Sequence, residues 1–329
     1  MLKKIAVLGS TGSVGTQALE VIDTLGFNVV ALAYGGNNKK LFKKQIEKYK
    51  PKIATTDLIE ASSVDADIFI LSVVGEVGTK AAYDILKKGK ILCIATKEVL
   101  VCEGKKIMDF AKKHNAEIRP LDSEHSAIWQ CLKGENKSEI EKIFLTCSGG
   151  PFLDAKKWTL EKLKNVDKSK VLNHPKWKMG QKITVDSATL INKALEFIEV
   201  CVLFDVKPEQ IEVVIHPEAI IHSAVQFKDG SVIAQMSPPD MKLPIAIALS
   251  YPERKHLPYS RLNIFDISPL NFFPVDKKRF PSIELAKKAI LQNKCREFNL
   301  ANEKAVKDFL EDKITFSDIF NKVKKSLNK

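Results

Sequence analysis

The chain of 329 residues has little of what marks fibrous, disordered or disulfide-rich proteins. It contains only 15 Gly, 14 Pro and six Cys, and no two cysteines have the C-x-x-C spacing of a zinc or redox motif. No apolar run approaches the ~18 residues of a membrane span, and the run MLKKIAVLGS enters a glycine loop as a strand does, unlike a signal peptide. We therefore expect a soluble, cytoplasmic, globular protein with reduced cysteines in its core.

A clustered stripe of arginine and aromatic residues, as a nucleic-acid site needs, is also missing. The 52 basic residues outnumber 40 acidic ones, for a net charge of +12, and nearly all are lysines spread in pairs such as Lys39-Lys40. We expect no nucleic-acid and no membrane partner. The positive charge is better suited to attracting anionic small molecules.

The first 25 residues have the pattern of a nucleotide-binding loop. An apolar run over residues 5–8 leads to Gly9, Gly12 and Gly15, followed by an amphipathic helix predicted over residues 14–25. The N-terminus of such a helix offers free N–H groups and a positive dipole end to a phosphate. This variant of the dinucleotide fingerprint predicts a dinucleotide-binding domain.

The strand predicted over residues 28–33 ends without an acidic residue. Tyr34, Gly35, Gly36 and Asn37 follow, and then Asn38 and two lysines. An acid at this point would bind the ribose 2′-hydroxyl and repel a 2′-phosphate. The sequence therefore favours NADPH over NADH.

Strands and helices continue to alternate up to residue 121, with strands expected over residues 68–74, 91–95 and 117–121 and helices over 81–88 and 104–114. This alternation predicts a doubly wound parallel sheet, which binds ligands at the carboxyl ends of its strands. Lys97, Asp122 and Glu124 lie at such ends. If the backbone stays extended there, Asp122 and Glu124 project to one side.

Two further carboxylates, Glu196 and Glu199, lie in one helix predicted over residues 187–204, among apolar neighbours. They either form surface ion pairs or join Asp122 and Glu124 in an all-oxygen site. Oxygen ligands of this kind suit Mg²⁺ or Mn²⁺ better than Zn²⁺.

Three short motifs offer ligands for a phosphate monoester: Ser148-Gly149-Gly150, Asp186-Ser187-Ala188-Thr189 and Asn192-Lys193. Between them, residues 174–180 carry Trp177 and Met179 in a polar loop bounded by Pro and Gly. Such a loop is typical of a lid that closes an apolar cover over a ligand.

These motifs, in this order from residue 1 to about residue 320, resemble the 1-deoxy-D-xylulose 5-phosphate reductoisomerase family. The resemblance implies an NADP-dependent enzyme of isoprenoid biosynthesis, in the methylerythritol phosphate pathway. Such an enzyme converts 1-deoxy-D-xylulose 5-phosphate into 2-C-methyl-D-erythritol 4-phosphate. It does so by a metal-assisted retro-aldol and aldol rearrangement, followed by hydride transfer from NADPH.

The resemblance also implies a role for each motif residue. One divalent ion (Mg²⁺ or Mn²⁺, with Co²⁺ a third candidate) would be bound by Asp122, Glu124 and Glu196. The catalytic residues would be Glu124, Lys97, His174 and Glu199. The substrate would contact Ser123, Glu124, Ser148, His174, Trp177, Ser187, Asn192, Lys193 and Glu196. The cofactor would contact Thr11, Gly12, Ser13, Val14, Gly35, Gly36, Asn37, Lys97, Glu98, Met179 and Gly180.

The implied architecture is a homodimer of α/β chains with three domains each. Residues 1–121 would form a Rossmann-like NADPH domain, and residues 122–255 a central α+β catalytic domain with a lid at about 173–181. Residues 256–329 would form a linker and a shortened C-terminal helical domain, which we expect to affect stability or packing and not activity. Gly36 stands where the family often has a basic residue, so Lys39 or Lys40 would bind the 2′-phosphate.

Two rival hypotheses remain open at this point. One is a semialdehyde-type dehydrogenase with Cys147 as thiolate nucleophile beside His174. The other is a redox-sensing NADPH-binding protein that has lost the chemistry. The retained acids Asp122, Glu124 and Glu196 argue against the second, because unpaired acids are costly in a pocket.

Overall fold

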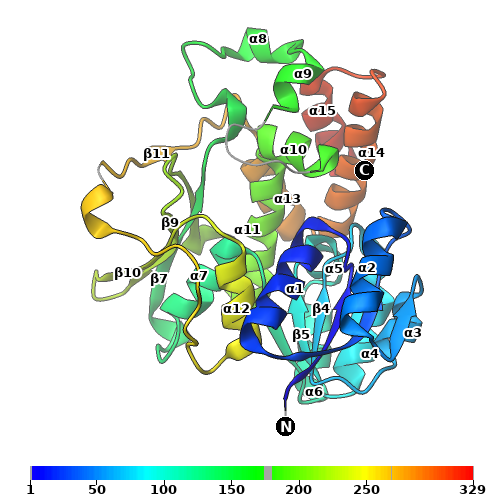
Figure 1. Ribbon diagram of the computed structural model, residues 1–329. Coiled ribbons are helices and arrows are strands. Elements are labelled where there is room, and N and C mark those ends of the chain that lie inside the picture. Colours follow the sequence, from blue (N-terminus) through cyan, green and yellow to red (C-terminus); the bar gives the residue numbers. More distant parts are fainter. Residues whose placement is uncertain (1, 174–179, 268, 329) are drawn as a thin grey trace. The chain divides into compact units, whose positions relative to one another are not determined.

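The computed structural model describes residues 2–173, 180–267 and 269–328 (Figure 1). The chain divides into two compact units. The N-terminal unit consists of Met1–Gln130 and Ser237–Leu262, and the C-terminal unit of Cys131–Met236 and Asn263–Lys329. No helix within the described residues combines the length and apolar character that crossing a bilayer requires.

The N-terminal unit is built on a six-stranded parallel sheet with the strand order β3-β2-β1-β4-β5-β6. The strands are β1 (Lys4–Leu8), β2 (Asn28–Ala33), β3 (Ile53–Thr55), β4 (Ile68–Leu71), β5 (Ile91–Ile94) and β6 (Glu117–Pro120). Ile5, Val7, Ile68 and Ile70 are fully buried, as expected for a parallel sheet covered on both faces. The predicted doubly wound fold is confirmed.

Helices complete the N-terminal unit. They are α1 (Ser13–Leu25), α2 (Lys39–Tyr49), α3 (Leu58–Ser62), α4 (Thr79–Lys87), α5 (Lys97–Glu103), α6 (Lys105–Lys113), α7 (Ser123–Cys131) and α12 (Lys242–Ser250), with the 3-10 turn η1 (Glu76–Gly78). The pattern analysis did not identify α2, β3, α3 or α5.

Helix α12 returns to the N-terminal unit from far along the sequence and packs on α1 (Figure 1). Ile245 and Leu249 are buried in the same core as Ile5. Lys3 Nζ donates to Leu249 O (3.2 Å) and Arg119 Nη1 to Ala248 O (2.7 Å), so two cations satisfy carbonyls at the end of α12. We predicted domain boundaries at residues 121 and 255. These boundaries refer to functional domains and stay a prediction.

The C-terminal unit contains a five-stranded mixed sheet with the order β10-β9-β7-β8-β11. Its strands are β7 (Ile140–Cys147), β8 (Ile211–Ile215), β9 (Ile221–Phe227), β10 (Val232–Met236) and β11 (Phe273–Pro274). Strands β7 and β8 are parallel, while β9, β10 and β11 pair antiparallel with their neighbours.

The helices of the C-terminal unit are α8 (Leu160–Lys164), α9 (Lys168–Val171), α10 (Gln181–Ala188), α11 (Ile191–Phe204), α13 (Ser282–Leu291), α14 (Cys295–Leu310) and α15 (Phe316–Ser326). Short 3-10 turns are η2 (Lys137–Glu139), η3 (Gly150–Phe152), η4 (Pro208–Gln210) and η5 (Ile264–Asp266). Helix α11 packs against α10, α13, α14 and β8, which explains why its sequence is apolar on most sides.

The single helix predicted over residues 187–204 is wrong, because the chain breaks at Leu190. Leu190 has a left-handed backbone (φ 55°), so α10 ends at Ala188 and α11 begins at Ile191. The Thr189 hydroxyl donates to Val185 O (2.9 Å) and Asp186 O (3.2 Å), which closes the end of α10. Apolar residues continue through the break, so periodicity alone does not reveal it.

The glycine loop predicts a sharp stability difference between two Gly→Ala variants. A Cβ at Gly15 would lie 2.2 Å from Gly9 O, whereas a Cβ at Gly35 would meet no atom within 4 Å. We expect Gly15→Ala to lower the free energy of unfolding by about 1–3 kcal/mol, because backbone cannot move aside as a flexible side chain can. Gly35→Ala is the matched control and should unfold at the wild-type urea concentration. Equal urea midpoints for the two variants would contradict this account of the loop.

Candidate active site

The loop from β1 to α1 presents an open helix N-terminus. Gly9 N and Ser10 N donate to Ala33 O (2.9 and 2.8 Å), and Gly12 N donates to Gly9 O (3.1 Å). Gly12 caps α1 without a side chain, and the first turn of α1 contains no acid. The free N–H groups at this end are therefore available to an anion, as a pyrophosphate requires.

The segment after β2 lies beside this loop. Thr11 Oγ1 donates to Asn37 O (3.2 Å), which joins two parts of the predicted cofactor set. Gly36 has φ +85°, and a Cβ placed there would meet no atom within 4 Å. Asn38 caps α2 by accepting from Leu41 N (3.2 Å), and exposed lysines Lys39 and Lys40 form its first turn.

A side-chain bridge holds the carboxyl ends of β4 and β5 together. The Thr96 hydroxyl donates to Val73 O (2.8 Å) and accepts from Val73 N (3.1 Å). Ser72 Oγ in turn donates to Leu8 O (3.2 Å) at the end of β1. These bonds thus fix the carboxyl-terminal edge of the sheet. Helix α5 starts from this edge with Lys97 and the buried Glu98.

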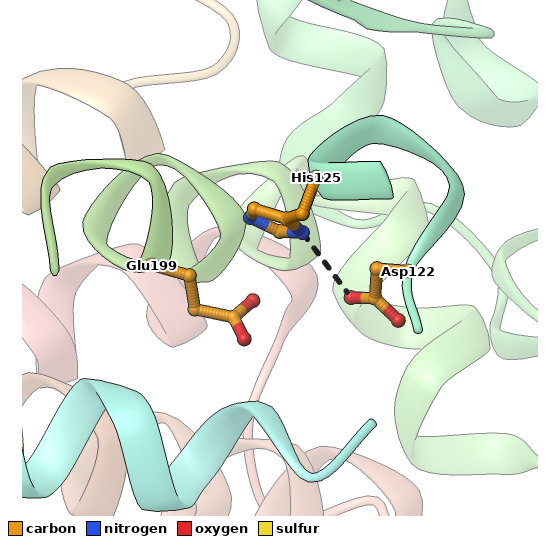
Figure 2. Close-up of side chains that lie close together, drawn as sticks. All are labelled: Asp122, His125 and Glu199. Atoms are coloured by element: carbon orange, nitrogen blue, oxygen red, sulfur yellow. Dashed lines mark ion pairs between the residues drawn. The ribbon is translucent and has the colours of Figure 1, made fainter. Parts of the chain in front are cut away.

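Lys97 and Asp122 form an ion pair at this edge. The Lys97 ammonium contacts Asp122 Oδ2, and His125 Nδ1 lies 3.8 Å from the same oxygen (Figure 2). The His125 side chain is buried, while Lys97 and Asp122 keep a small exposed fraction. The carboxylate that sequence reasoning assigned to a metal therefore lies between two nitrogen groups of its own unit.

The extended backbone that we assumed for Asp122 and Glu124 is wrong. Ser126 N donates to Asp122 O (2.9 Å), so the helix α7 begins directly after Asp122 and places Glu124 in its first turn. Ser123 Oγ donates to Glu124 Oε2 (2.6 Å). Alternation across a strand consequently does not govern where these two carboxylates point.

In the C-terminal unit, the loop after β7 lies against the junction of α10 and α11. Gly149 and Gly150 have left-handed backbones (φ +85° and +65°), and a Cβ at Gly150 would lie 3.1 Å from Ser187 O. This approach brings the Ser148 loop to the end of α10, where Ser187 lies, and close to the start of α11. Two of the motifs predicted to bind phosphate therefore meet within one unit, and the third, Asn192-Lys193, follows in the first turn of α11.

Helix α11 carries a polar cluster in its first turns. Asn192 Nδ2 donates to Glu196 Oε1 (2.5 Å), and Lys193 Nζ pairs with Glu196 Oε2. Glu196 is 2% exposed and Glu199 4%, which rules out the surface ion-pair alternative for these two acids. A buried cation and a buried acid are thus adjacent, one suited to a phosphate and the other to a metal ion.

Residues that sequence reasoning missed hold the α10–α11 junction. Asn302 Nδ2 donates to Asp186 Oδ1 (2.8 Å) from α14, and Lys182 Nζ pairs with Asp186 at 3.1 Å. Ser282 Oγ, at the start of α13, donates to Thr189 O (2.6 Å). Single contacts of this kind have no local motif, so only the fold reveals them.

The remaining predictions fall on the lid and on the cysteines. His174, Trp177 and Met179 lie outside the described residues, whereas Gly180 caps α10. All six cysteines carry thiols, and burial raises the pKa of the three thiols of Cys93, Cys201 and Cys295 to about 12. Cys147 is half-buried at the end of β7.

Matches with known proteins extend over most of the chain. A family model for 1-deoxy-D-xylulose 5-phosphate reductoisomerase matches residues 5–58. Two models for C-terminal domains of the same enzyme match residues 118–204 and 236–329. The reductoisomerases of Chlamydia felis and Lachnospira eligens are 42% and 43% identical over 98% and 99% of this chain, which align with 92% and 93% of those proteins.

Solved structures agree with this assignment. A DOX-P reductoisomerase in complex with NADPH, fosmidomycin and magnesium superposes with a TM-score of 0.89 at 36% identity. The Zymomonas mobilis reductoisomerase in complex with NADPH superposes with a TM-score of 0.90 at 34% identity. Both alignments cover 100% of this chain and 90% and 92% of the other chains. The semialdehyde-dehydrogenase alternative is not favoured, and the chain belongs to the 1-deoxy-D-xylulose 5-phosphate reductoisomerase family.

Proposed function

We propose that this chain catalyses the NADPH-dependent conversion of 1-deoxy-D-xylulose 5-phosphate into 2-C-methyl-D-erythritol 4-phosphate. The observation that carries the proposal is 42–43% identity to reductoisomerases over nearly the whole chain. The open α1 N-terminus and the Ser148 loop supply one anion-binding element in each unit.

NADPH fits the N-terminal unit. The α1 N-terminus has no acid in its first turn, so Thr11, Gly12, Ser13 and Val14 would hold the pyrophosphate. The segment Gly35-Gly36-Asn37 is open and carries no carboxylate that would repel a 2′-phosphate. The exposed lysines of the first turn of α2 would bind that phosphate.

A divalent metal ion fits the chemistry of the donor set. Asp122, Glu124 and Glu196 offer only oxygen ligands, as Mg²⁺ and Mn²⁺ prefer. Two of these acids each have a lysine as partner in the structure, Lys97 for Asp122 and Lys193 for Glu196, whose charge a divalent cation would replace. When bound, such an ion acts as a Lewis acid towards the substrate oxygens.

The C-terminal unit would bind the phosphate end of the substrate. Ser148, Ser187, Asn192 and Lys193 supply hydroxyl, amide and ammonium donors, and Lys193 is buried, which strengthens its attraction for a dianion. Contacts at this end do not touch the reacting carbons. Their binding energy anchors the substrate equally in the ground state and the transition state, so it lowers KM.

Proton transfer and orientation fall to the remaining polar residues. The rearrangement needs a hydroxyl proton removed and later returned, and we assign this to Glu124 and Glu199, with His174 beside the phosphate. Lys97 lies at the start of α5 and would orient both the Asp122 carboxylate and the nicotinamide end of the cofactor. Ser123 would contact the substrate hydroxyls, Trp177 would cover the substrate, and Glu98, Met179 and Gly180 would contact the cofactor.

A second copy of the chain is the proposed partner, and the cytoplasm its proposed location. Both edges of the five-stranded sheet carry exposed apolar residues, Val232 and Ile233 on β10 and Phe273 on β11. Phe265, 91% exposed, lies in η5 of the same unit. Edge strands of this type are sites where another chain can pair, which supports a homodimer.

Glu196→Gln should abolish metal-dependent turnover. The amide cannot supply the negative oxygen ligand, so we expect kcat/KM to fall by at least about 100-fold with Mn²⁺ present. NADPH consumption with 1-deoxy-D-xylulose 5-phosphate measures the effect, and NADPH binding should be unchanged. The matched control is Glu212→Gln, an exposed acid of β8 that pairs with Lys142 at 2.9 Å. Equal activity of the two variants would show that Glu196 is not a metal ligand.

Cys147→Ser should keep its activity within about threefold of wild type, because the proposed chemistry needs no thiolate. The dehydrogenase alternative predicts the opposite, since it makes this thiol the nucleophile. The same NADPH assay distinguishes them. Cys201→Ser serves as the control for replacing a thiol elsewhere in the C-terminal unit.

The double variant Lys39→Met, Lys40→Met should raise the KM for NADPH about tenfold, because it removes two cations beside the 2′-phosphate. Turnover with NADH, which lacks that phosphate, should not change. Lys43→Met, Lys44→Met on the next turn of α2 is the control and should resemble wild type. A KM that rises equally for both cofactors would show that α2 acts on folding and not on phosphate recognition.

A further inference from the structure

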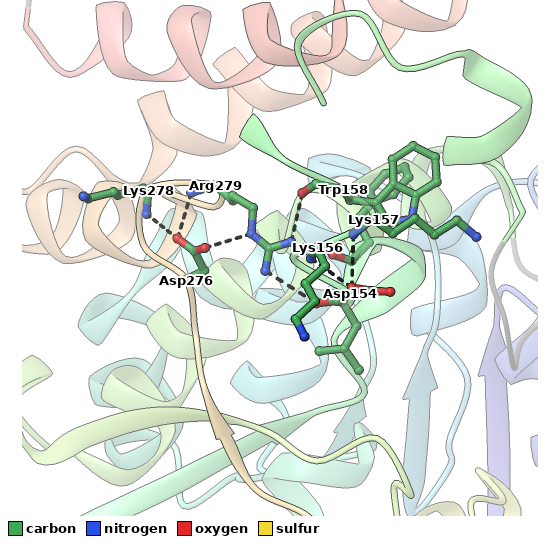
Figure 3. A network of polar contacts seen from close by, with 9 residues as sticks. Asp154, Lys156, Lys157, Trp158, Asp276, Lys278 and Arg279 are labelled. Atoms are coloured by element: carbon green, nitrogen blue, oxygen red, sulfur yellow. Dashed lines mark hydrogen bonds and ion pairs between the residues drawn. The ribbon is translucent and has the colours of Figure 1, made fainter. Parts of the chain in front are cut away.

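Arg279 holds one short segment of the C-terminal unit by its backbone. Its guanidinium Nη1 donates to Phe152 O (2.9 Å) and Trp158 O (3.2 Å), and Nη2 lies 3.5 Å from Leu153 O. The residue is 8% exposed and precedes α13 in the sequence. Figure 3 shows how the fork reaches into this segment. A planar fork of donors is what allows one side chain to bind several carbonyls.

Asp276 fixes the direction of the Arg279 side chain. Its Oδ2 accepts from Arg279 Nε (2.8 Å), and its Oδ1 accepts from the backbone N–H groups of Lys278 and Arg279 (3.0 and 3.1 Å; Figure 3). Burial would raise the pKa of Asp276, but the hydrogen bonds from Arg279 and the backbone outweigh it and lower the pKa. The guanidinium charge is therefore compensated by Asp276, so Arg279 is not itself set up as an anion ligand.

The segment that Arg279 holds is compact in itself. Asp154 Oδ1 accepts from Lys156 N (2.9 Å) and Lys157 N (3.1 Å), and Trp158 N donates to Asp154 O (2.9 Å) (Figure 3). The ring of Phe152 is buried and packs edge-on against Trp158 at 4.9 Å. Arg279 consequently binds a turn that is closed by its own hydrogen bonds.

This turn continues directly into the loop that would bind phosphate. Phe152 ends η3, which begins at Gly150. A Cβ at Gly149 would lie 3.0 Å from the Leu153 side chain, and one at Gly150 3.1 Å from Ser187 O. The glycine backbone is thus confined between Leu153 and the end of α10. A shift of Phe152 or Leu153 must move Ser148 relative to Ser187.

We propose that Arg279 is a positioning residue for substrate affinity, which holds the Ser148-Gly149-Gly150 loop in register with Ser187 through the carbonyls of Phe152, Leu153 and Trp158. The proposal rests on the proposed function, because that function makes the loop a ligand of the substrate phosphate. Loss of Arg279 weakens a contact that is remote from the reacting carbons. It therefore raises KM and leaves kcat nearly unchanged.

The test compares Arg279→Met and Arg279→Lys with the control Lys322→Met, which breaks a cation–carboxylate contact to Asp308 (2.8 Å) between α14 and α15 of the same unit. Steady-state assays give KM and kcat for 1-deoxy-D-xylulose 5-phosphate with NADPH and Mn²⁺. Thermal melts with saturating NADPH then measure the rise in Tm caused by inorganic phosphate, which reports phosphate binding without turnover. Saturating NADPH keeps the cofactor loop from responding to the added phosphate.

We expect Arg279→Met to raise KM about 10- to 50-fold with kcat within about threefold, and to lose the phosphate-induced rise in Tm. Arg279→Lys should raise KM nearly as much as Arg279→Met, because the ammonium lacks the planar fork whose two nitrogens reach three separate carbonyls. If Arg279→Met does not fold, Arg279→Lys carries the same comparison. Lys322→Met should lower Tm. Its KM and the rise of its Tm with phosphate should equal those of wild type.

Three results would overturn the proposal. The first is a lowered Tm with unchanged KM and phosphate response in the Arg279 variants, which would make Arg279 purely structural. The second is an equal rise of KM in Lys322→Met, and the third is a wild-type Tm that does not respond to phosphate. If wild type binds phosphate and the Arg279 variants do not, yet wild type fails to turn over the substrate, the proposed function is wrong and the positioning role stands.

Discussion

Close approach of backbone to backbone shapes both loops that are predicted to bind anions in this protein. A Cβ at Gly9 would lie 2.4 Å from Ser72 O, and one at Gly15 would lie 2.2 Å from Gly9 O. In the other unit, Gly150 approaches Ser187 O in the same manner. N–H groups can surround a phosphate only where side chains do not hold the backbone away from it. In the N-terminal unit, the hydrogen bonds of the Thr96 hydroxyl to Val73 also hold the ends of β4 and β5 together.

Charge pairs that are largely shielded from water are the second common feature of the two units. Lys97 pairs with Asp122 in one unit and Lys193 with Glu196 in the other. A buried ion pair contributes little net stability, because removing both charges from water offsets most of their attraction. The presence of two such pairs is explained if the acids and Lys193 bind ligands in place of their present partners. The acids would then turn to a divalent cation and Lys193 to a phosphate, so that one ligand favours binding of the other.

The sequence contained the information that resides in local patterns. Glycine spacing, apolar strands and an absent acid after β2 predicted the parallel sheet and its dinucleotide loop, because each depends on neighbouring residues. The break at Leu190 was not predictable, since Thr and Leu are ordinary helix residues and tertiary contacts impose the left-handed backbone. The start of α7 directly after Asp122 was not predicted for a related reason: a strand end and a helix start both accept a short polar stretch. The return of α12 to the N-terminal unit has no local signal at all.

The segments that carry the predicted phosphate ligands are held by residues more than 90 positions away in sequence, which changes the expected role of the C-terminal helices. Ser282 Oγ donates to Thr189 O across 93 positions, and Asn302 Nδ2 donates to Asp186 Oδ1 across 116 positions. Arg279 holds Phe152 across 127 positions. The sequence patterns had placed no substrate or cofactor ligand in residues 256–329. Because these side chains bind the Asp186 carboxylate and the carbonyls of Thr189 and Phe152, close in sequence to the predicted phosphate ligands, their loss would alter substrate affinity as well as stability. At these three positions the same contacts would support both stability and substrate affinity, whereas the Lys322–Asp308 contact between α14 and α15 would support stability alone.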